Sequence, residues 1–118
     1  MSDVVSIHPY FRVHPGKLDQ FKALLPKLIE RVTKEEGCLG YDFTVSGDLV
    51  FCREAYRGAA GLLAHAANVE DLIGEALGMA DLERVELHGP AAELEQLREP
   101  FAAMNPEYFE FVCGLKQS

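Results

Sequence analysis

Hydrophobic and polar residues alternate along several short stretches of the chain, the pattern typical of β-strands that bury one face. The first stretch, residues 4–13, has apolar residues at its odd positions, whereas His8, Tyr10 and Arg12 occupy the other face. Pro9 has no backbone N–H to donate, so this strand is predicted to lie at a sheet edge or to bulge there. The same alternation predicts further strands over residues 38–45, 49–56, 82–88 and 108–115.

Apolar residues recur at helical spacing between these strands. The longest such segment, residues 17–36, is predicted to form one helix capped by Gly37, with Glu35 among its outward-facing charges. Residues 58–79 predict a second helical region in two pieces, and Asn68 is the expected N-cap of the second piece.

The predicted elements follow the order β-α-β-β-α-β, after which a short helix opened by Pro90 and a last strand are added. The first six elements are those of a ferredoxin-like α+β fold, an antiparallel sheet with helices on one face. One domain over residues 1–118 is predicted, with a core over 4–88 and a helix-strand extension over 89–118. The polar and aromatic outer face of the first strand predicts a symmetric, sheet-to-sheet homodimer.

The composition excludes several classes of protein. With 118 residues, 48% hydrophobic and 25% charged, the chain is expected to be a soluble globule, neither disordered nor fibrous. A formal charge of −8 argues against nucleic acid and against an anionic membrane surface. Three cysteines without C-x-x-C spacing favour a reducing compartment, and no signal peptide or membrane-spanning run is recognisable, so a cytoplasmic location is expected.

Common signatures of bound groups are missing from the sequence. It contains neither G-x-G-x-x-G nor the phosphate-binding G-x-x-x-x-G-K-[ST], and no H-E-x-x-H or Cys/His cluster with metal-ligand spacing. The G-x-S-x-G elbow of α/β-hydrolases is also missing. We therefore expect neither a cofactor nor a metal.

Three segments carry a resemblance to a known family. Residues 13–21 join the first strand to an amphipathic helix through Pro-Gly, and residues 35–43 contain an E-x-G-C-x-x-Y pattern. Residues 51–65 contain Glu54 and Tyr56 followed by a helical segment with His65. In this order they resemble the antibiotic biosynthesis monooxygenase superfamily over residues 4–88, whose members form dimeric α/β barrels. The extension departs from the compact family pattern, and it is expected either to cover the dimer interface or to add a strand to the partner's sheet.

The resemblance implies a cofactor-independent monooxygenase that acts on a quinol, phenol or anthrone-like aromatic substrate. The haem-degrading branch of the family is disfavoured, because its members use an Asn on the first strand and a Trp, whereas this chain has no tryptophan. Two alternatives remain open. One is a non-catalytic or stress-associated dimeric barrel that holds a small hydrophobic ligand, and the other is an isomerase or lyase.

His65 matches the family's histidine position, and its ordinary pKa suits it to act as a base, with small neighbouring residues leaving room for a ligand. The further candidates are Tyr10 and Tyr56 as catalytic residues, and His8, Arg12 and Glu54 as substrate-binding residues. Each has a structural alternative. His65 is alternatively a structural histidine bonded to backbone or to Glu54, and the residues on the first strand alternatively form a polar dimer interface, with Arg12 paired to Glu86 or Asp42.

Overall fold

The structure, a computed structural model, describes residues 3–115. The elements follow closely on one another along the chain: β1 (Val4–Val13), α1 (Leu18–Val32), β2 (Cys38–Ser46), β3 (Leu49–Arg57), α2 (Gly58–Asn68), α3 (Glu70–Leu77), β4 (Ala80–Gly89), α4 (Ala91–Leu97), the 3-10 helix η1 (Ala102–Met104) and β5 (Glu107–Glu110).

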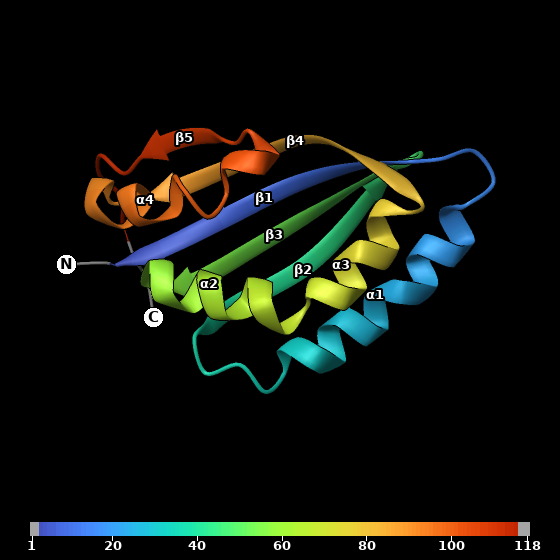
Figure 1. The fold of residues 1–118 in the computed structure, drawn as a ribbon, viewed down its shortest axis with the longest axis horizontal. Coiled ribbons are helices and arrows are strands. Elements are labelled where there is room, and N and C mark those ends of the chain that lie inside the picture. Colours follow the sequence, from blue (N-terminus) through green and yellow to red (C-terminus); the bar gives the residue numbers. More distant parts are fainter. Residues whose placement is uncertain (1–2, 116–118) are drawn as a thin grey trace.

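The five strands form one open, mixed sheet in the order β2-β3-β1-β4-β5 (Figure 1). All neighbouring strands are antiparallel except β4 and β5, which run parallel. The order of β1 to β4, with the helical layers on one face, is the ferredoxin-like arrangement that the sequence predicted.

β1 follows the predicted alternation, because every odd position from Val5 to Val13 is buried and every even position is partly exposed. The prediction of an edge position at Pro9 is wrong, since β1 lies in the middle of the sheet. An irregularity does occur nearby, because the pairing of β1 with β4 shifts register between Tyr10 and Phe11. The two faces of β1 therefore meet different surroundings: helices on one side, and an outer face free of helices on the other (Figure 1).

Two clusters of buried side chains fill the space between the sheet and its helices. One joins α1 and α3 to the sheet and is centred on Phe21, Leu28 and Val50. The other joins α2 and α4 to the sheet and includes Ile7 and Leu97. The boundary between the clusters lies where α2 passes into α3, and the candidate site described below occupies this boundary.

α1 ends earlier than the sequence predicted. The predicted cap at Gly37 is wrong: Thr33 is the C-cap, and its hydroxyl donates to the carbonyl of Ile29 at 2.8 Å. The chain then turns and brings Glu35 towards α2. Gly37 lies against Gly61 of α2, where a Cβ on Gly37 would stand 3.0 Å from the Gly61 Cα. A side chain at Gly37 would therefore push this loop away from α2.

The split of the second helical region into α2 and α3 is confirmed, but the predicted role of Asn68 is wrong. Val69 is the N-cap of α3, and it makes no side-chain capping bond. The Asn68 amide instead donates to the Glu35 carboxylate at 2.8 Å and to the Arg31 carbonyl at 3.3 Å. Asn68 therefore ties α2 to the end of α1 instead of starting a helix.

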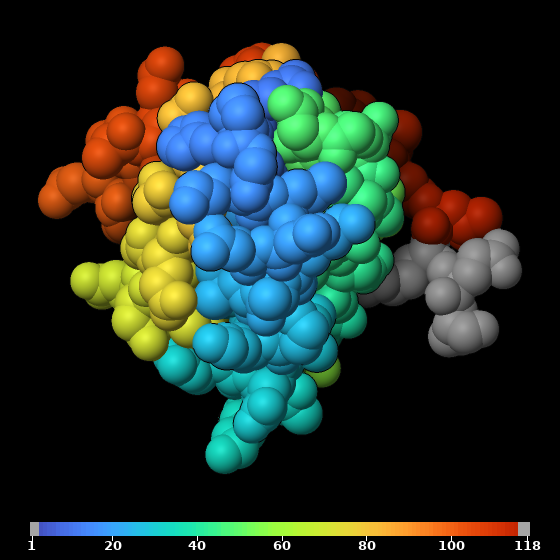
Figure 2. All heavy atoms as spheres, turned by 90° about the vertical axis from the view of Figure 1, so that its right-hand side faces the viewer, coloured from blue at the N-terminus to red at the C-terminus, as the bar shows by residue number. Residues whose placement is uncertain are grey.

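The extension packs on its own subunit. Pro90 precedes α4 as its N-cap, and the helix leads through η1 to β5, which pairs with β4. The last strand is much shorter than the predicted 108–115, because it ends at Glu110. Phe111 still donates to the carbonyl of Gly89 at 2.8 Å, and residues 111–115 are exposed. Figure 2 shows dark red residues of the extension at the side of the compact body. Within the chain, β5 adds to its own sheet, next to β4.

No helix among residues 3–115 is both long and apolar enough to cross a membrane. Cys38, Cys52 and Cys113 are free thiols, of which Cys52 is buried and Cys113 exposed.

We expect the extension to be an integral part of the folded unit. Leu97 of α4 is fully buried against β1, β4 and α2, so Leu97→Ala should lower the free energy of unfolding by about 2–5 kcal/mol through lost burial and an internal cavity. Urea unfolding followed by circular dichroism measures this change. The exposed neighbour substitution Gln96→Ala is the control, and an equally small effect of both would contradict the packing described here.

Candidate active site

The buried face of β3 carries three polar side chains in a row. Cys52, Glu54 and Tyr56 are spaced two residues apart, so all three point towards the helices. Their exposed fractions are 1%, 5% and 0%. A carboxylate this deeply buried is costly unless hydrogen bonds or opposite charges satisfy it. The side chains that surround Glu54 are therefore candidate functional residues.

His65 of α2 supplies the opposite charge. Its Nε2 lies 3.2 Å from Glu54 Oε1, and the Tyr56 hydroxyl donates to the same oxygen at 2.6 Å. On the other side of the ring, Nδ1 lies 3.0 Å from Glu35 Oε2. The rings of Tyr41 and Tyr56 contact the imidazole at centroid distances of 5.2 and 4.8 Å. His65 is therefore held on both sides between two carboxylates.

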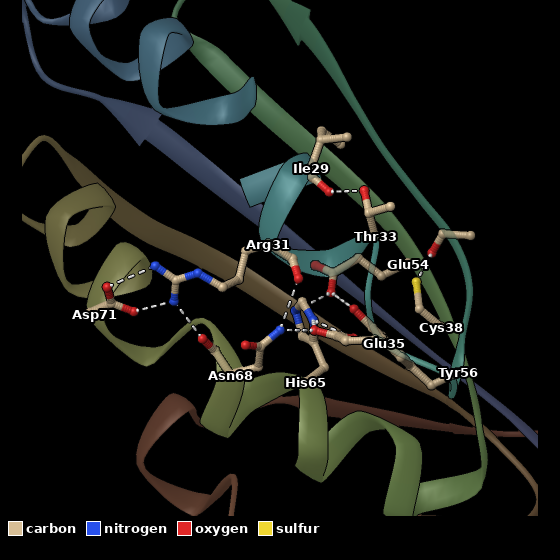
Figure 3. A network of polar contacts seen from close by, with 11 residues as sticks. Ile29, Arg31, Thr33, Glu35, Cys38, Glu54, Tyr56, His65, Asn68 and Asp71 are labelled. Carbon is tan, nitrogen blue, oxygen red and sulfur yellow. Dashed lines mark hydrogen bonds and ion pairs between the residues drawn. The ribbon is translucent and has the colours of Figure 1, made fainter. Parts of the chain in front are cut away.

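A second set of contacts holds Glu35 in place (Figure 3). The side-chain amide of Asn68 donates to Glu35 Oε2, while Arg31 donates to the backbone carbonyl of Asn68 at 2.8 Å. Arg31 also makes a two-pronged contact with Asp71 at 2.9 and 3.2 Å. These bonds join the end of α1 to α2 and α3, so the position of Glu35 depends on the packing of three helices.

The charges around His65 favour its protonated form. Burial lowers the pKa of His65, but the hydrogen bonds and negative charges of Glu54 and Glu35 outweigh burial and raise that pKa overall above its ordinary value. The geometry agrees, because only the doubly protonated ring can donate to an ionised carboxylate on each side. The site therefore combines an imidazolium with two carboxylates, one of which is available as a base.

The neighbouring hydroxyl and thiol remain protonated. Burial and the charge of Glu54 raise the pKa of Tyr56 and of Cys52 far above their ordinary ranges. Burial, with Glu54 as the next cause, does the same to the pKa of Tyr41. Tyr56 is thus a hydrogen-bond donor to Glu54, and neither Tyr56 nor Cys52 is suited to act as a nucleophile.

A pocket of about 530 Å³ opens directly above Glu54 and His65. Its volume lies in the range of small-molecule sites. Apolar side chains from β1, β4, α2, α3 and the extension line it, among them Ile7, Phe11, Leu62, Ile73, Val85 and Phe101. Among the described lining residues, the polar side chains are Glu54, His65 and Glu70. A ligand in this pocket would have an apolar body and would meet the carboxylate and the imidazole at its inner end.

The structure brings together only some of the residues singled out from the sequence. Glu54, Tyr56 and His65 form one cluster, and the contact between His65 and Glu54 that was the structural alternative to a catalytic His65 is present. His8 and Tyr10 lie on the other face of the sheet, because they occupy even positions of β1.

Arg12 also lies on that outer face. It pairs with Asp48 at 2.7 Å and with Glu83 at 2.8 Å, so the predicted pairing with Glu86 or Asp42 across strands is wrong within the chain, whereas the same pairing across subunits stays a prediction. The strand register explains the difference, since Arg12 pairs across the sheet with Leu49 and Asp81 and therefore lies beyond the reach of either predicted partner.

Aromatic rings form a row across the outer face. His8 stacks on Phe51 at 5.8 Å and meets His88 edge-on at 5.0 Å, while His88 stacks on Phe109 at 4.5 Å. Tyr10 contacts Phe51 at 4.8 Å. We call these five residues the outer aromatic row. Its rings are partly exposed in the single chain, so this face is separate from the pocket.

Sequence reasoning missed Glu35 as a site residue. The residue belongs to the E-x-G-C segment, but helical periodicity placed it on an outward-facing turn. The early end of α1 and the Gly37–Gly61 contact turn it inward. The early end of α1 and the Gly37–Gly61 contact depend on tertiary packing, which the spacing of apolar residues along the sequence does not reveal.

No group of three or more His, Cys, Asp or Glu side chains suited to hold a metal occurs within residues 3–115. Both ring nitrogens of His65 face carboxylate oxygens, so this histidine has no nitrogen free for an iron ligand.

The fold and the site define a ferredoxin-like α+β protein with a buried acid–base cluster beneath an apolar pocket. Comparison with known proteins agrees with this class. The family model of the antibiotic biosynthesis monooxygenases matches residues 4–70. No match is found among curated proteins. The chain belongs to the antibiotic biosynthesis monooxygenase family.

Among solved structures, MupZ from Pseudomonas fluorescens is 40% identical, with a TM-score of 0.95 over 99% of this chain and 91% of that one. A conserved protein from Methanosarcina mazei Go1 is 21% identical, with a TM-score of 0.66 over 71% of this chain and 89% of that one. Rv0793 from Mycobacterium tuberculosis is 24% identical, with a TM-score of 0.65 over 74% of this chain and 94% of that one. The last two similarities concern the fold alone.

We expect the Glu35 carboxylate to help keep His65 charged. Glu35→Gln should lower the pKa of His65, because a neutral amide replaces one of the two carboxylates that raise it. A pH titration followed by NMR of ¹⁵N-labelled imidazole measures the change, with Glu36→Gln as a matched control next to it in sequence. An unchanged His65 pKa in Glu35→Gln would contradict the described contact.

The same substitution should affect stability in a pH-dependent manner. A folded-state pKa above about 6.5 means that the charged His65 stabilises the fold fully below about pH 6.5, and that this stabilisation is lost as pH rises through the folded-state pKa. The difference in unfolding free energy between wild type and Glu35→Gln should therefore be largest near pH 6 and shrink above it. A difference that grows with pH would contradict this sign.

Proposed function

We propose that this protein is an enzyme that transfers a proton to or from a small, largely apolar molecule held in the pocket. One observation carries the proposal: Glu54 and His65 form a buried polar floor in a cavity whose other lining residues, apart from Glu70, are apolar. A buried charged pair without a function is expensive to maintain, and groups of this kind cluster at active sites. Family membership supports a role on small molecules in general terms.

Glu54 is the proposed base and His65 the proposed acid. With both carboxylates ionised and the imidazole charged, the cluster carries one surplus negative charge, so it can take up one proton from a hydroxyl or an acidic C–H of the ligand. The proton would pass to a Glu54 oxygen, and His65 and Tyr56 would hold that carboxyl group in place through their contacts with Glu54 Oε1. The apolar walls would exclude water from the anion that forms.

The first candidate reaction is cofactor-independent monooxygenation of a quinol, phenol or anthrone-like substrate, which family membership favours. Removal of a proton from an activated methylene would give a carbanion able to reduce dioxygen. One oxygen atom would then stay on the carbon as a carbonyl, and the other would leave as water. The substrate supplies the four electrons and both hydrogen atoms of that water, so no other reductant is required.

The second candidate is a reaction without oxygen, such as an isomerisation or a lyase reaction. The observation that favours it is the placement of an acid and a base side by side, His65 beside Glu54. Such a pair can take a proton from one atom of the substrate and return one to another. The first candidate requires mainly a base, whereas this one uses both groups.

For the outer face we propose a different role. The outer aromatic row, with Arg12 beside it, would pack against the same face of a second copy and form the two-sheet barrel of a homodimer. Its partly exposed rings would then gain cover that the single chain does not provide. His8, Tyr10 and Arg12 would contribute to this interface and leave the proton transfer to Glu54, Tyr56 and His65.

The three free thiols fit the proposal that the dimer works in a reducing cytoplasm.

We expect Glu54→Gln and His65→Gln to reduce turnover by about 10²- to 10⁴-fold, the usual contribution of a general acid or base. Oxygen uptake with a panel of hydroquinones and anthrones tests the first candidate reaction. Deuterium exchange from solvent into the same compounds under nitrogen tests the second. Glu83→Gln, which removes an exposed carboxylate on the outer face, is the control.

The outcomes distinguish the two candidate reactions from each other and from a binding function. Oxygen uptake that Glu54→Gln abolishes supports monooxygenation, and deuterium exchange without oxygen uptake supports the second candidate. Thermal stabilisation by these ligands with neither reaction would identify a binding protein and overturn the enzyme proposal.

The dimer proposal predicts twice the monomer mass in light scattering at micromolar concentration. Phe51→Asp should shift the protein to the monomer, because a carboxylate would be buried in the centre of the outer aromatic row. Ile29→Asp changes a half-exposed apolar residue on the helical side and should leave the mass unchanged. A monomeric wild type would contradict the proposal.

A further inference from the structure

The extension, and not only the family core, forms a wall of the pocket. Pro100, Phe101 and Met104 line the cavity, opposite Ile73 and Leu77 of α3. The segment that carries them lies between α4 and β5, far beyond residue 70, where the match to the family model ends.

The shorter relatives match a part of this chain about as long as the family core. The Methanosarcina mazei and Mycobacterium tuberculosis structures cover 71% and 74% of this chain, yet 89% and 94% of their own length. That share is about what residues 4–88 make up of the 118 residues. MupZ, in contrast, covers 99% of this chain, so its fold includes a counterpart of the extension.

The segment that forms this wall packs tightly against the rest of the fold. Leu94, Leu97 and Phe101 are 3%, 0% and 4% exposed within the second core cluster. Between Leu97 and Phe101, the guanidinium of Arg98 lies 4.3 Å from the ring centre of Tyr108, which joins the segment to β5. Phe101 is therefore a fixed surface, comparable to the side chains of the sheet.

Met104 is placed differently. It lines the pocket but is 39% exposed, and Leu77 across from it is 44% exposed. Glu54 and His65 are each 5% exposed. The polar groups therefore lie at the closed end of the cavity, and the opening lies between α3 and η1. A ligand that reaches Glu54 with its polar group would extend its apolar body past Phe101 towards Met104.

We propose that Phe101 and Met104 set the substrate specificity of the pocket, by selecting amphiphilic molecules with a hydroxyl or acidic head and an apolar body long enough to reach η1. This inference rests on the proposed function, because it takes the pocket to be the substrate site. In it, Phe101 forms the inner wall, and the flexible methionine extends the apolar surface to the rim of the opening, beyond which a longer chain reaches solvent. The compact relatives, without this segment, would stop gaining affinity at a shorter chain length.

A series of 4-alkylphenols, from methyl to decyl, tests the length limit by isothermal titration calorimetry. For wild type, affinity should rise by about fourfold per methylene, the contribution of one buried CH₂, up to a chain length beyond which it stays level. Met104→Ala should move that limit to shorter chains, because apolar surface at the rim is lost. Met104→Trp should move it to longer chains, because a larger apolar side chain covers more of the ligand, while binding of 4-methylphenol stays unchanged.

Val112→Ala is the matched control, because Val112 belongs to the same extension, is 87% exposed and does not line the pocket. Circular dichroism and thermal unfolding check that each variant is folded, and Leu77→Trp, on the opposite side of the opening, replaces Met104→Trp if the latter is not. An identical length limit in wild type and both Met104 variants would overturn the inference. Failure of wild type to bind any alkylphenol would instead count against the proposed function.

Discussion

The structure depends on the burial of one carboxylate. Glu54 lies in the middle of a sheet face packed against helices, where an isolated charge would be strongly unfavourable. Its partners come from its own strand, from α2 and, through His65, from the loop after α1. The contacts of Glu54 therefore form only when the sheet, α1, α2 and the loop after α1 are in their final places. The chemistry of the site and the packing of the fold cannot be separated.

The sequence predicted the fold much better than the site. Period-two alternation located β1 and β3 nearly to the residue, because one face of each is buried in the same chain. It located β2 equally well, although none of the residues of β2 is fully buried. Helix ends were less predictable. α1 ends at Val32 through a local Thr33 bond and a contact with α2, and neither is visible in the spacing of apolar residues. The inward turn of Glu35 could not be predicted for the same reason.

The candidate residues on β1 illustrate a second limit. Alternation correctly assigned His8, Tyr10 and Arg12 to one face, but it gives no indication of which face carries helices. Polar and aromatic groups on a strand are equally compatible with a ligand site and with a subunit interface. Only the three-dimensional arrangement separates the cluster around Glu54 from the outer aromatic row on the far side of the same sheet.

The parallel pairing of β5 with β4 has a consequence for how such proteins diversify. A strand, a helix and a parallel strand form a self-contained crossover unit, which attaches to the free edge of a sheet without changing the order or register of the strands already present. One wall of the cavity can therefore be lengthened, shortened or exchanged while the buried carboxylate and its partners stay untouched. In this architecture, the shape of the cavity can evolve by addition at an edge, independently of Glu54 and His65.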